Sequence, residues 1–219
     1  MSEISTKDIV GKILKISGMY SPEIVFRDWV RMMALAMSNA CRLRHDEIWK
    51  LREEEYISLF RKYGADNVKC FSEMQAELAL IFEKKFADHL GLIYMESNSG
   101  SAKTGQFFTP YHVAELVAKI APESMKYEKV ILNEPSCGGG GMIIAKAADL
   151  KDRGIDPQKA MKVIAQDLDQ TCVSMCYVQL SLLGIDAICI QGDSLCQPYQ
   201  PGYDELRIYR TPRNVGMLL

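Results

Sequence analysis

The sequence lacks several features that would assign it to a common class of protein. No apolar run approaches the roughly 18 residues needed to span a bilayer, and the mixed polar sequence after Met1 contains no secretory signal. The seven cysteines form no Cys-x-x-Cys pair, and only three histidines occur. A metal site would therefore lack its usual ligand spacing, so we expect no bound metal. We expect a cytoplasmic protein with reduced thiols and no membrane segment.

An excess of charge of one sign is also absent. The 26 basic and 28 acidic side chains give a net charge of −2. A large basic surface is thus not required by composition, and any contact with DNA would need a local patch. A small basic cluster, Arg207, Arg210 and Arg213, is expected to be a solvated tail rather than a phosphate contact. The length of 219 residues is enough for one large domain or for a domain with a helical extension.

The first hundred residues are expected to form helices. The sequence at 21–23, Ser-Pro-Glu, is typical of a helix start, and apolar side chains follow it at three- and four-residue spacing. A second helix is predicted over residues 45–63, and a third from Ser72, whose hydroxyl can cap it, to Gly91. We therefore predict a helical N-terminal domain over residues 1–97, with the apolar stripes forming its core.

A second pattern begins after the small, polar segment around residues 97–105, which is expected to be a boundary or a mobile loop. Short apolar runs at 130–132, 162–167 and 187–190 are predicted to be strands, and amphipathic helices are predicted between them. Strands that alternate with helices favour a parallel sheet with right-handed crossovers. We therefore predict an α/β domain over residues 104–219.

The most informative feature is the run Asn-Glu-Pro-Ser-Cys-Gly-Gly-Gly-Gly at 133–141. It lies between the first predicted strand and the helix that follows. Strand, carboxylate, glycine-rich turn and helix form the arrangement by which an open α/β sheet holds a nucleoside-bearing cofactor. Glycine lets the backbone turn sharply and approach a ligand, and four glycines in a row cost stability without such a reason. We therefore favour a ligand-binding turn over a purely structural one.

Each of the three predicted strands ends in an acidic residue, namely Glu134, Asp167 and Asp193. In such a sheet ligands bind beyond the carboxyl ends of the strands, so we expect these side chains to share one crevice. They suit S-adenosylmethionine, which carries an ammonium group, a ribose diol and an adenine amine. A dinucleotide fits less well, because the third glycine of its motif would fall at Ile143. A phosphate-binding P-loop is excluded, since no Gly-Lys-Ser/Thr follows the glycines.

Several motifs occur in a fixed order: Gly-Gln-Phe-Phe-Thr-Pro at 105–110, Glu-Pro-Ser-Cys-Gly-Gly-Gly at 134–140, Asp167, and Gly-Asp-Ser-Leu at 192–195. This set resembles the successive motifs of adenine-specific DNA methyltransferases. The chain is similar to the modification subunits of type I restriction–modification systems, which also have a helical N-terminal region. The resemblance covers residues 104–195. It implies a Rossmann-like S-adenosylmethionine-dependent methyltransferase domain behind a helical domain, in a restriction–modification or mobile-element system.

The resemblance also implies roles for single residues. Residues Gln106–Pro110 would close over the methionine end of the cofactor, and Glu134 would hold its ammonium group. Gly138 and Gly140 would leave room for the cofactor next to the backbone. Phe107 and Phe108, within the first of these segments, could instead be core aromatics.

On the nucleoside side, Asp167 would accept hydrogen bonds from the ribose hydroxyls while Leu168 packs on the adenine. Asp193 would accept from the adenine amine. The full set implied to bind the cofactor is Gln106, Phe107, Phe108, Thr109, Pro110, Glu134, Pro135, Ser136, Gly138, Gly140, Asp167, Leu168, Asp193 and Ser194.

One motif of the resembled family is missing. Those enzymes grip a flipped adenine with an Asn/Asp-Pro-Pro-Tyr/Phe loop, and no Asn-Pro-Pro or Asp-Pro-Pro occurs in this sequence. No catalytic residue is therefore assigned. We expect the isolated chain to bind cofactor but to methylate DNA poorly, with DNA contacts made through a specificity or catalytic subunit. The alternatives are a catalytically inactive S-adenosylmethionine-binding subunit and a methyltransferase that acts on RNA or protein.

Overall fold

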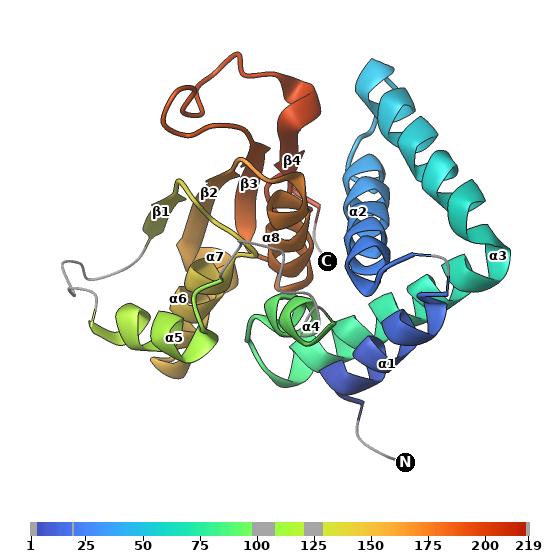
Figure 1. The fold of residues 1–219 in the computed structure, drawn as a ribbon. Helices are drawn as coiled ribbons and strands as arrows, with labels where there is room; N and C mark the ends of the chain where they lie inside the picture. Colours follow the sequence, from blue (N-terminus) through green and yellow to red (C-terminus); the bar gives the residue numbers. More distant parts are fainter. Residues whose placement is uncertain (1–3, 19, 98–107, 121–128, 218–219) are drawn as a thin grey trace. The chain divides into compact units, whose positions relative to one another are not determined.

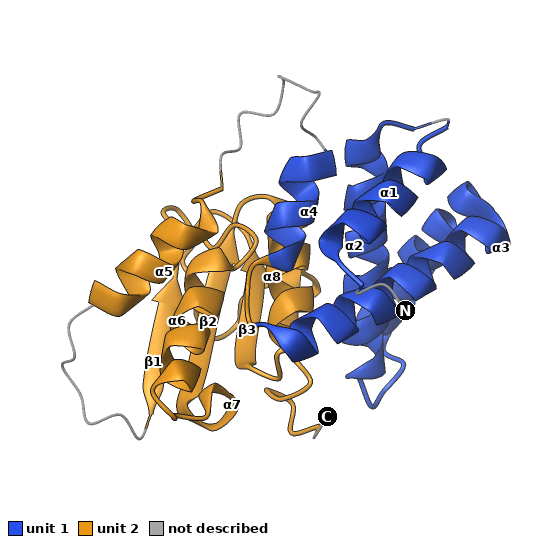
Figure 2. Ribbon diagram, turned by 90° about the horizontal axis from the view of Figure 1, so that it is seen from below, with its two compact units in different colours: residues 1–85, 89–107 blue, residues 86–88, 108–219 orange. Residues whose placement is uncertain are grey.

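The computed structural model describes residues 4–18, 20–97, 108–120 and 129–217 (Figure 1). The chain forms two compact units, residues 1–85 with 89–107 and residues 86–88 with 108–219 (Figure 2). The first unit is helical, and the second contains the sheet. Residues 86–88 lie between two helices of the first unit in the sequence but group with the second unit, which the sequence pattern did not predict.

The helical unit consists, in its described residues, of α1 (Thr6–Ile16), α2 (Pro22–Ala40), α3 (Glu47–Lys84) and α4 (His89–Ser97). The predicted start of α2 is confirmed, since the Ser21 hydroxyl accepts a hydrogen bond from the Ile24 amide at 3.4 Å. Trp29 is fully buried and donates its indole N–H to the Phe71 carbonyl at 3.1 Å. No helix in the described residues is both long enough and apolar enough to cross a membrane.

The helix predicted over residues 45–63 is confirmed, whereas the helix predicted from Ser72 to Gly91 has other ends. Helical structure runs from Glu47 to Lys84 and is interrupted only at Gly64, which has a φ of 74°. Ser72 lies inside this helix, where its hydroxyl donates to the Val68 carbonyl at 3.1 Å instead of capping. Gly91 lies within α4. The predicted start at Ser72 and the predicted end at Gly91 are therefore wrong, because helical structure resumes directly after Gly64 and ends at Lys84.

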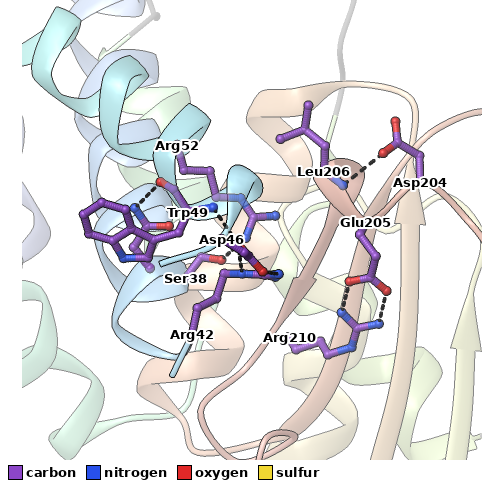
Figure 3. Close-up of polar contacts among 10 residues, drawn as sticks. Ser38, Arg42, Asp46, Trp49, Arg52, Asp204, Glu205, Leu206 and Arg210 are labelled. Atoms are coloured by element: carbon purple, nitrogen blue, oxygen red, sulfur yellow. Dashed lines mark hydrogen bonds and ion pairs between the residues drawn. The ribbon is translucent and has the colours of Figure 1, made fainter. Parts of the chain in front are cut away.

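Charged side chains fix the junction between α2 and α3 (Figure 3). Asp46 caps α3 by accepting from the Trp49 amide at 2.9 Å, and it also pairs with Arg42. The hydrogen bond from Arg42 lowers the pKa of Asp46 to about 2. Arg52, buried in this unit, donates to the Ser38 hydroxyl at 2.6 Å. The turn that reverses the chain is thus held by ionised groups.

The second unit is built on a sheet of β1 (Val130–Glu134), β2 (Met161–Asp167), β3 (Asp186–Gln191) and β4 (Ile208–Arg210). The strands lie in that order; the first three are parallel and β4 is antiparallel to β3. The predicted parallel sheet is confirmed. Figure 1 shows the segment after β3 looping out beyond the carboxyl ends of the strands before it returns as β4.

Helices connect the parallel strands. α6 (Gly141–Asp152) and α7 (Pro157–Ala160) lead from β1 to β2, and α8 (Gln170–Leu182) leads from β2 to β3. Successive right-handed crossovers in one direction place α6 and α8 on the same face of the sheet. The helix α5 (Tyr111–Ile120) packs against α6 through the buried alanines Ala114, Ala118 and Ala145, whose small side chains permit close approach. These layers form the core below the carboxyl ends of the strands.

The predicted solvated tail at 207–213 is wrong, because this segment contains β4. Ile208 and Tyr209 are each 2% exposed, and the ring of Tyr209 lies 5.5 Å from that of Tyr177. Arg210 donates to both carboxylate oxygens of Glu205, at 2.6 and 2.7 Å (Figure 3). Arginines on either side of two buried residues concealed a short strand at the sheet edge.

Thr211 offers a test of how this edge is held. Its hydroxyl is completely buried, donates to the Ile185 carbonyl at 2.7 Å and accepts from the Ala187 amide at 3.0 Å. Thr211→Val leaves both backbone groups unsatisfied, so we expect a loss of about 2–3 kcal/mol in the free energy of unfolding, measured by urea denaturation. Thr211→Ser keeps the hydroxyl and should lose only about 1 kcal/mol. Equal losses would contradict the importance of these hydrogen bonds.

Candidate cofactor site

The turn between β1 and α6 has a backbone conformation that requires glycine. Gly138 has a φ of 51° and Gly140 a φ of 94°, both in the left-handed region that other residues seldom adopt. The Gly140 amide donates to the Cys137 carbonyl at 2.8 Å, which closes the turn. The Cys137 amide donates to the Gln166 carbonyl at 3.0 Å. The turn is therefore tied directly to the neighbouring strand β2.

Close packing is a second reason for the glycines. A Cβ atom on Gly139 would stand 3.0 Å from the terminal methyl of Met175, and one on Gly140 would stand 3.1 Å from the Cys176 sulfur. A Cβ on Gly138 would stand 3.2 Å from the ring of Phe108. A side chain at any of these three positions would therefore require its neighbour to shift by a few tenths of an ångström. The run of glycines satisfies the packing on α8 as well as the turn itself.

Asp167, at the end of β2, links the strand to the glycine turn. One carboxylate oxygen accepts from the Gly138 amide at 2.8 Å and the other accepts from the Asp169 amide at 2.9 Å. A carboxylate has about four lone-pair positions, so these two bonds leave capacity for external donors. The half-buried side chain can therefore hold the turn and face a ligand at the same time.

Asp193 lies just beyond β3 and forms a tight turn of its own. Its Oδ1 accepts from the amides of Leu195 at 2.9 Å and Cys196 at 3.1 Å. These backbone N–H groups, the Cys196 amide above all, lower the pKa of the Asp193 carboxyl, which is thus ionised at neutral pH. The Gly192 amide donates to the Asp167 carbonyl at 2.8 Å. The ends of β2 and β3 are thereby held together immediately before Asp193.

Glu134 occupies the end of β1. Its Oε1 accepts from the Ser136 amide at 3.3 Å and the Ser136 hydroxyl at 3.5 Å. In the register of the sheet Glu134 pairs with Ala165, two residues before Asp167. The three acids therefore lie at the carboxyl ends of neighbouring parallel strands, each about two residues further along than the one before, where ligands bind in such sheets.

The other residues implied to bind the cofactor are placed as follows. Gln106 and Phe107 lie outside the described residues. Phe108 is half-buried beside Gly138, as the glycine packing indicates. The remaining positions are exposed or half-exposed along the same edge or just before α5: Thr109, Pro110, Pro135, Ser136, Leu168 (68% exposed) and Ser194.

Gln166 contributes to the site although the sequence did not predict it. Its side chain is only 3% exposed, donates from Nε2 to the Gln197 carbonyl at 2.9 Å and accepts at Oε1 from the Tyr199 amide at 3.1 Å. These two hydrogen bonds therefore attach the loop that follows Asp193 to the central strand β2. A polar amide within an otherwise apolar strand was the signal that could have identified it.

Buried thiols lie beneath the glycine turn. Cys137, Cys176 and Cys189 are buried, and the sulfurs of Cys176 and Cys189 are 4.0 Å apart. A hydrogen bond with Cys176 and burial raise the pKa of Cys137 well above its usual range. A neutral thiol is a weak nucleophile and a poor metal ligand, so this cluster serves packing. No group of three or more side chains suited to a metal ion occurs in the described residues.

Comparison with known proteins agrees with this geometry. Residues 87–208 match the family described as N-6 DNA Methylase. The chain is 24% identical over 153 residues to the type I restriction enzyme MpnII methylase subunit of Mycoplasma pneumoniae, a match that covers 61% of this chain and 27% of the relative. The chain thus spans about a quarter of the length of that curated relative.

A solved structure gives the same result for the fold. The chain is similar to a class I S-adenosylmethionine-dependent methyltransferase from Listeria monocytogenes, with a TM-score of 0.52 and 15% sequence identity. The match covers 90% of this chain and 55% of the other. The Rossmann-like α/β methyltransferase fold expected from the sequence is confirmed.

Two glycines with nearly equal φ angles allow the energetic cost of backbone strain to be measured apart from the cost of a packing clash. Gly140 (φ 94°) faces Cys176, whereas a Cβ on Gly202 (φ 93°) would have no neighbouring atom within 4 Å. We expect Gly202→Ala to lower the free energy of unfolding by about 1 kcal/mol through strain alone. Gly140→Ala should lower it by at least about 1 kcal/mol more, because its methyl group also meets the Cys176 sulfur. Equal losses in urea denaturation would show that the contact with α8 carries no energy.

Proposed function

This chain belongs to the N-6 DNA methylase family, and from that premise we propose that it forms the cofactor-binding part of a methyltransferase that modifies the N6 amine of adenine in DNA. The observation that carries the proposal is that three acids lie at the carboxyl ends of neighbouring strands. Asp167 ends β2 and holds the glycine turn, Glu134 ends β1, and Asp193 follows β3. The order of these residues in the sequence matches the order of the strands in the sheet.

The residues present fit S-adenosylmethionine. The cofactor carries positive charge on its sulfonium and ammonium groups and offers donors on its ribose and adenine. Glu134, Asp167 and Asp193 supply acceptors at this edge, and hydrogen bonds to ionised groups are each worth about 1.5–3 kcal/mol. Gly138 and Gly140 would contribute through the left-handed backbone of the turn, since Phe108 and Cys176 occupy the space beside them where a Cβ would lie. Glu134 would hold the ammonium group, Asp167 the ribose and Asp193 the adenine amine.

When bound, S-adenosylmethionine supplies a methyl group on a positively charged sulfur for in-line transfer to a nitrogen lone pair. The residues of this chain would contribute orientation, because proximity and alignment provide much of the rate enhancement in such a transfer. The carboxylates would also favour a cationic ligand electrostatically. Asp193 is suited to this task at neutral pH, since its pKa is lowered by the amides of Leu195 and Cys196.

Recognition of the substrate would involve further residues. The 219 residues contain no Asn-Pro-Pro or Asp-Pro-Pro, the sequence that grips a flipped adenine in the resembled enzymes. We infer that this loop and the reading of DNA sequence are supplied by residues outside these 219, and a specificity subunit is the partner that we propose for reading the DNA sequence. A DNA substrate and such partners would place the assembly in the cytoplasm.

Cofactor binding can be tested at Asp167. We expect Asp167→Ala to weaken S-adenosylmethionine binding at least about tenfold, equivalent to about 1.4 kcal/mol, in isothermal titration calorimetry. The reason is that the variant loses both the expected acceptor for the ribose and the bond that orients the Gly138 amide. Asp156→Ala is a matched control, because Asp156 also accepts a backbone amide at a helix start, at 3.0 Å from Gln158, but lies away from the strand ends.

The control should bind with wild-type affinity. Thermal melts of both variants identify any loss caused by unfolding. Unchanged affinity in folded Asp167→Ala would remove this residue from the site, and no binding by the wild-type chain would contradict the assignment of the cofactor.

The substrate can be tested with a radiolabelled methyl group. We expect the chain alone to transfer little methyl to DNA, and we expect transfer to rise at least about tenfold when a partner that supplies the Pro-Pro loop is added. The product should be N6-methyladenine, identified by mass spectrometry of the digested DNA. Robust turnover by the chain alone would contradict the need for a partner, and label found only in RNA or protein would contradict the DNA assignment.

A further inference from the structure

Two buried polar side chains lie behind the glycine turn, on the side of the turn that faces α8. Asp88 is 5% exposed and Gln179 is completely buried. Asp88 belongs to the three-residue segment 86–88 that groups with the α/β unit, and Gln179 is in the last turns of α8. None of the roles considered above uses either residue. Polar groups at this depth are retained only when they are hydrogen-bonded, so their partners are informative.

Gln179 joins Asp88 to the turn. Its Nε2 donates to Asp88 Oδ1 at 2.8 Å and to the Gly139 carbonyl at 2.7 Å. An amide nitrogen has two hydrogens, so these two bonds use its full donor capacity. The Gly139 carbonyl is thereby fixed between Gly138, whose amide donates to Asp167, and Gly140, which directly precedes α6.

Asp88 also lies at the start of α6. A Cβ atom on Gly141, the first residue of α6, would stand 3.1 Å from Asp88 Oδ2. The N-cap residue is Gly140, which has no side chain to cap the helix. The carboxylate of Asp88 therefore supplies negative charge at the positive end of the helix dipole, where a capping side chain would normally act. Its position fixes the orientation of the helix start as well as that of Gln179.

We propose that Asp88 and Gln179 are positioning residues for the cofactor site, because they hold the Gly139 peptide and the start of α6 in the one arrangement that presents Gly138 to Asp167. The inference rests on the proposed cofactor function. A turn with two residues in the left-handed region can relax to other conformations when an anchor is lost. The pair is expected to act by preventing that relaxation, and neither residue needs to touch the cofactor.

The first variant is Gln179→Met, which keeps the length of the side chain and removes both donors. We expect about tenfold weaker binding of S-adenosylmethionine by calorimetry, at a temperature well below the midpoint of thermal unfolding. Asp88→Ala should have a similar effect. Asp88→Asn, which keeps an acceptor for Gln179, should recover a substantial part of the affinity. Because the two residues act through one contact, the Asp88→Ala/Gln179→Met double variant should bind no more than about twofold weaker than the weaker single variant.

Thr211→Val is the control for a merely structural effect. It removes buried hydrogen bonds in the same unit, at the β3–β4 edge, without touching the turn. It should lower stability and keep wild-type affinity. A second readout needs no cofactor: the amides of Gly138 and Gly140 should exchange hydrogen faster in Gln179→Met than in the wild type, and at the wild-type rate in Thr211→Val.

These measurements separate the two proposals. Wild-type affinity together with wild-type exchange in folded Gln179→Met would overturn the positioning role and leave the cofactor assignment intact. Equal loss of affinity in Thr211→Val would also overturn it. If the wild-type chain binds no S-adenosylmethionine, the proposed function fails, and faster exchange at the glycines would then support only the anchoring of the turn.

Discussion

The hydrogen bond from the Gly138 amide to the Asp167 carboxylate is the contact on which the rest of the site depends. It joins the loop after β1 to the end of β2, and the bond from the Cys137 amide to the Gln166 carbonyl lies beside it. Two strands and the turn between β1 and α6 are thereby fixed to one another at the edge where ligands bind in such sheets. A carboxylate in this position performs a structural task and still has lone pairs that point elsewhere.

Close contacts around the glycine turn also restrict its shape. The glycines pack directly on Met175 and Cys176 of α8, so the turn and the helix share one surface. Neutral, buried thiols fill the space below, where larger side chains would push the turn outward. Rigid support of this kind is what a ligand needs when alignment rather than an acidic or basic catalyst drives the reaction.

Local sequence patterns predicted the sheet well because its strands are short apolar runs between glycine-containing turns. The three- and four-residue spacing of apolar side chains predicted the helices equally well, but it did not predict all of their ends. The end predicted at residue 63 was right, but Ser72 can cap a helix or bond within one, and only packing decides, so the next helix was predicted to start eight residues after Gly64. The strand β4 was missed because charged neighbours surround Ile208 and Tyr209.

The residues at the site were predicted to different extents for a physical reason. Glu134, Asp167 and Asp193 stand at strand ends, and position in the chain alone indicates that edge. Gln179 and Asp88 are 91 residues apart, and their contact has no local signal in the sequence. Gln106 and Phe107 lie outside the described residues, so their place relative to the turn stays a prediction.

The membership of residues 86–88 in the α/β unit has a consequence for how this protein can be divided. The Phe86 carbonyl accepts from the Tyr111 hydroxyl at 3.1 Å, and the Lys151 ammonium lies 4.1 Å above the Phe86 ring. The segment enters the α/β unit between α3 and α4, so one cut between residues 97 and 108 would not yield two intact pieces. A fragment that begins at residue 108 would lack Phe86 and Asp88, and with them the contacts of these residues with Tyr111, Lys151 and Gln179.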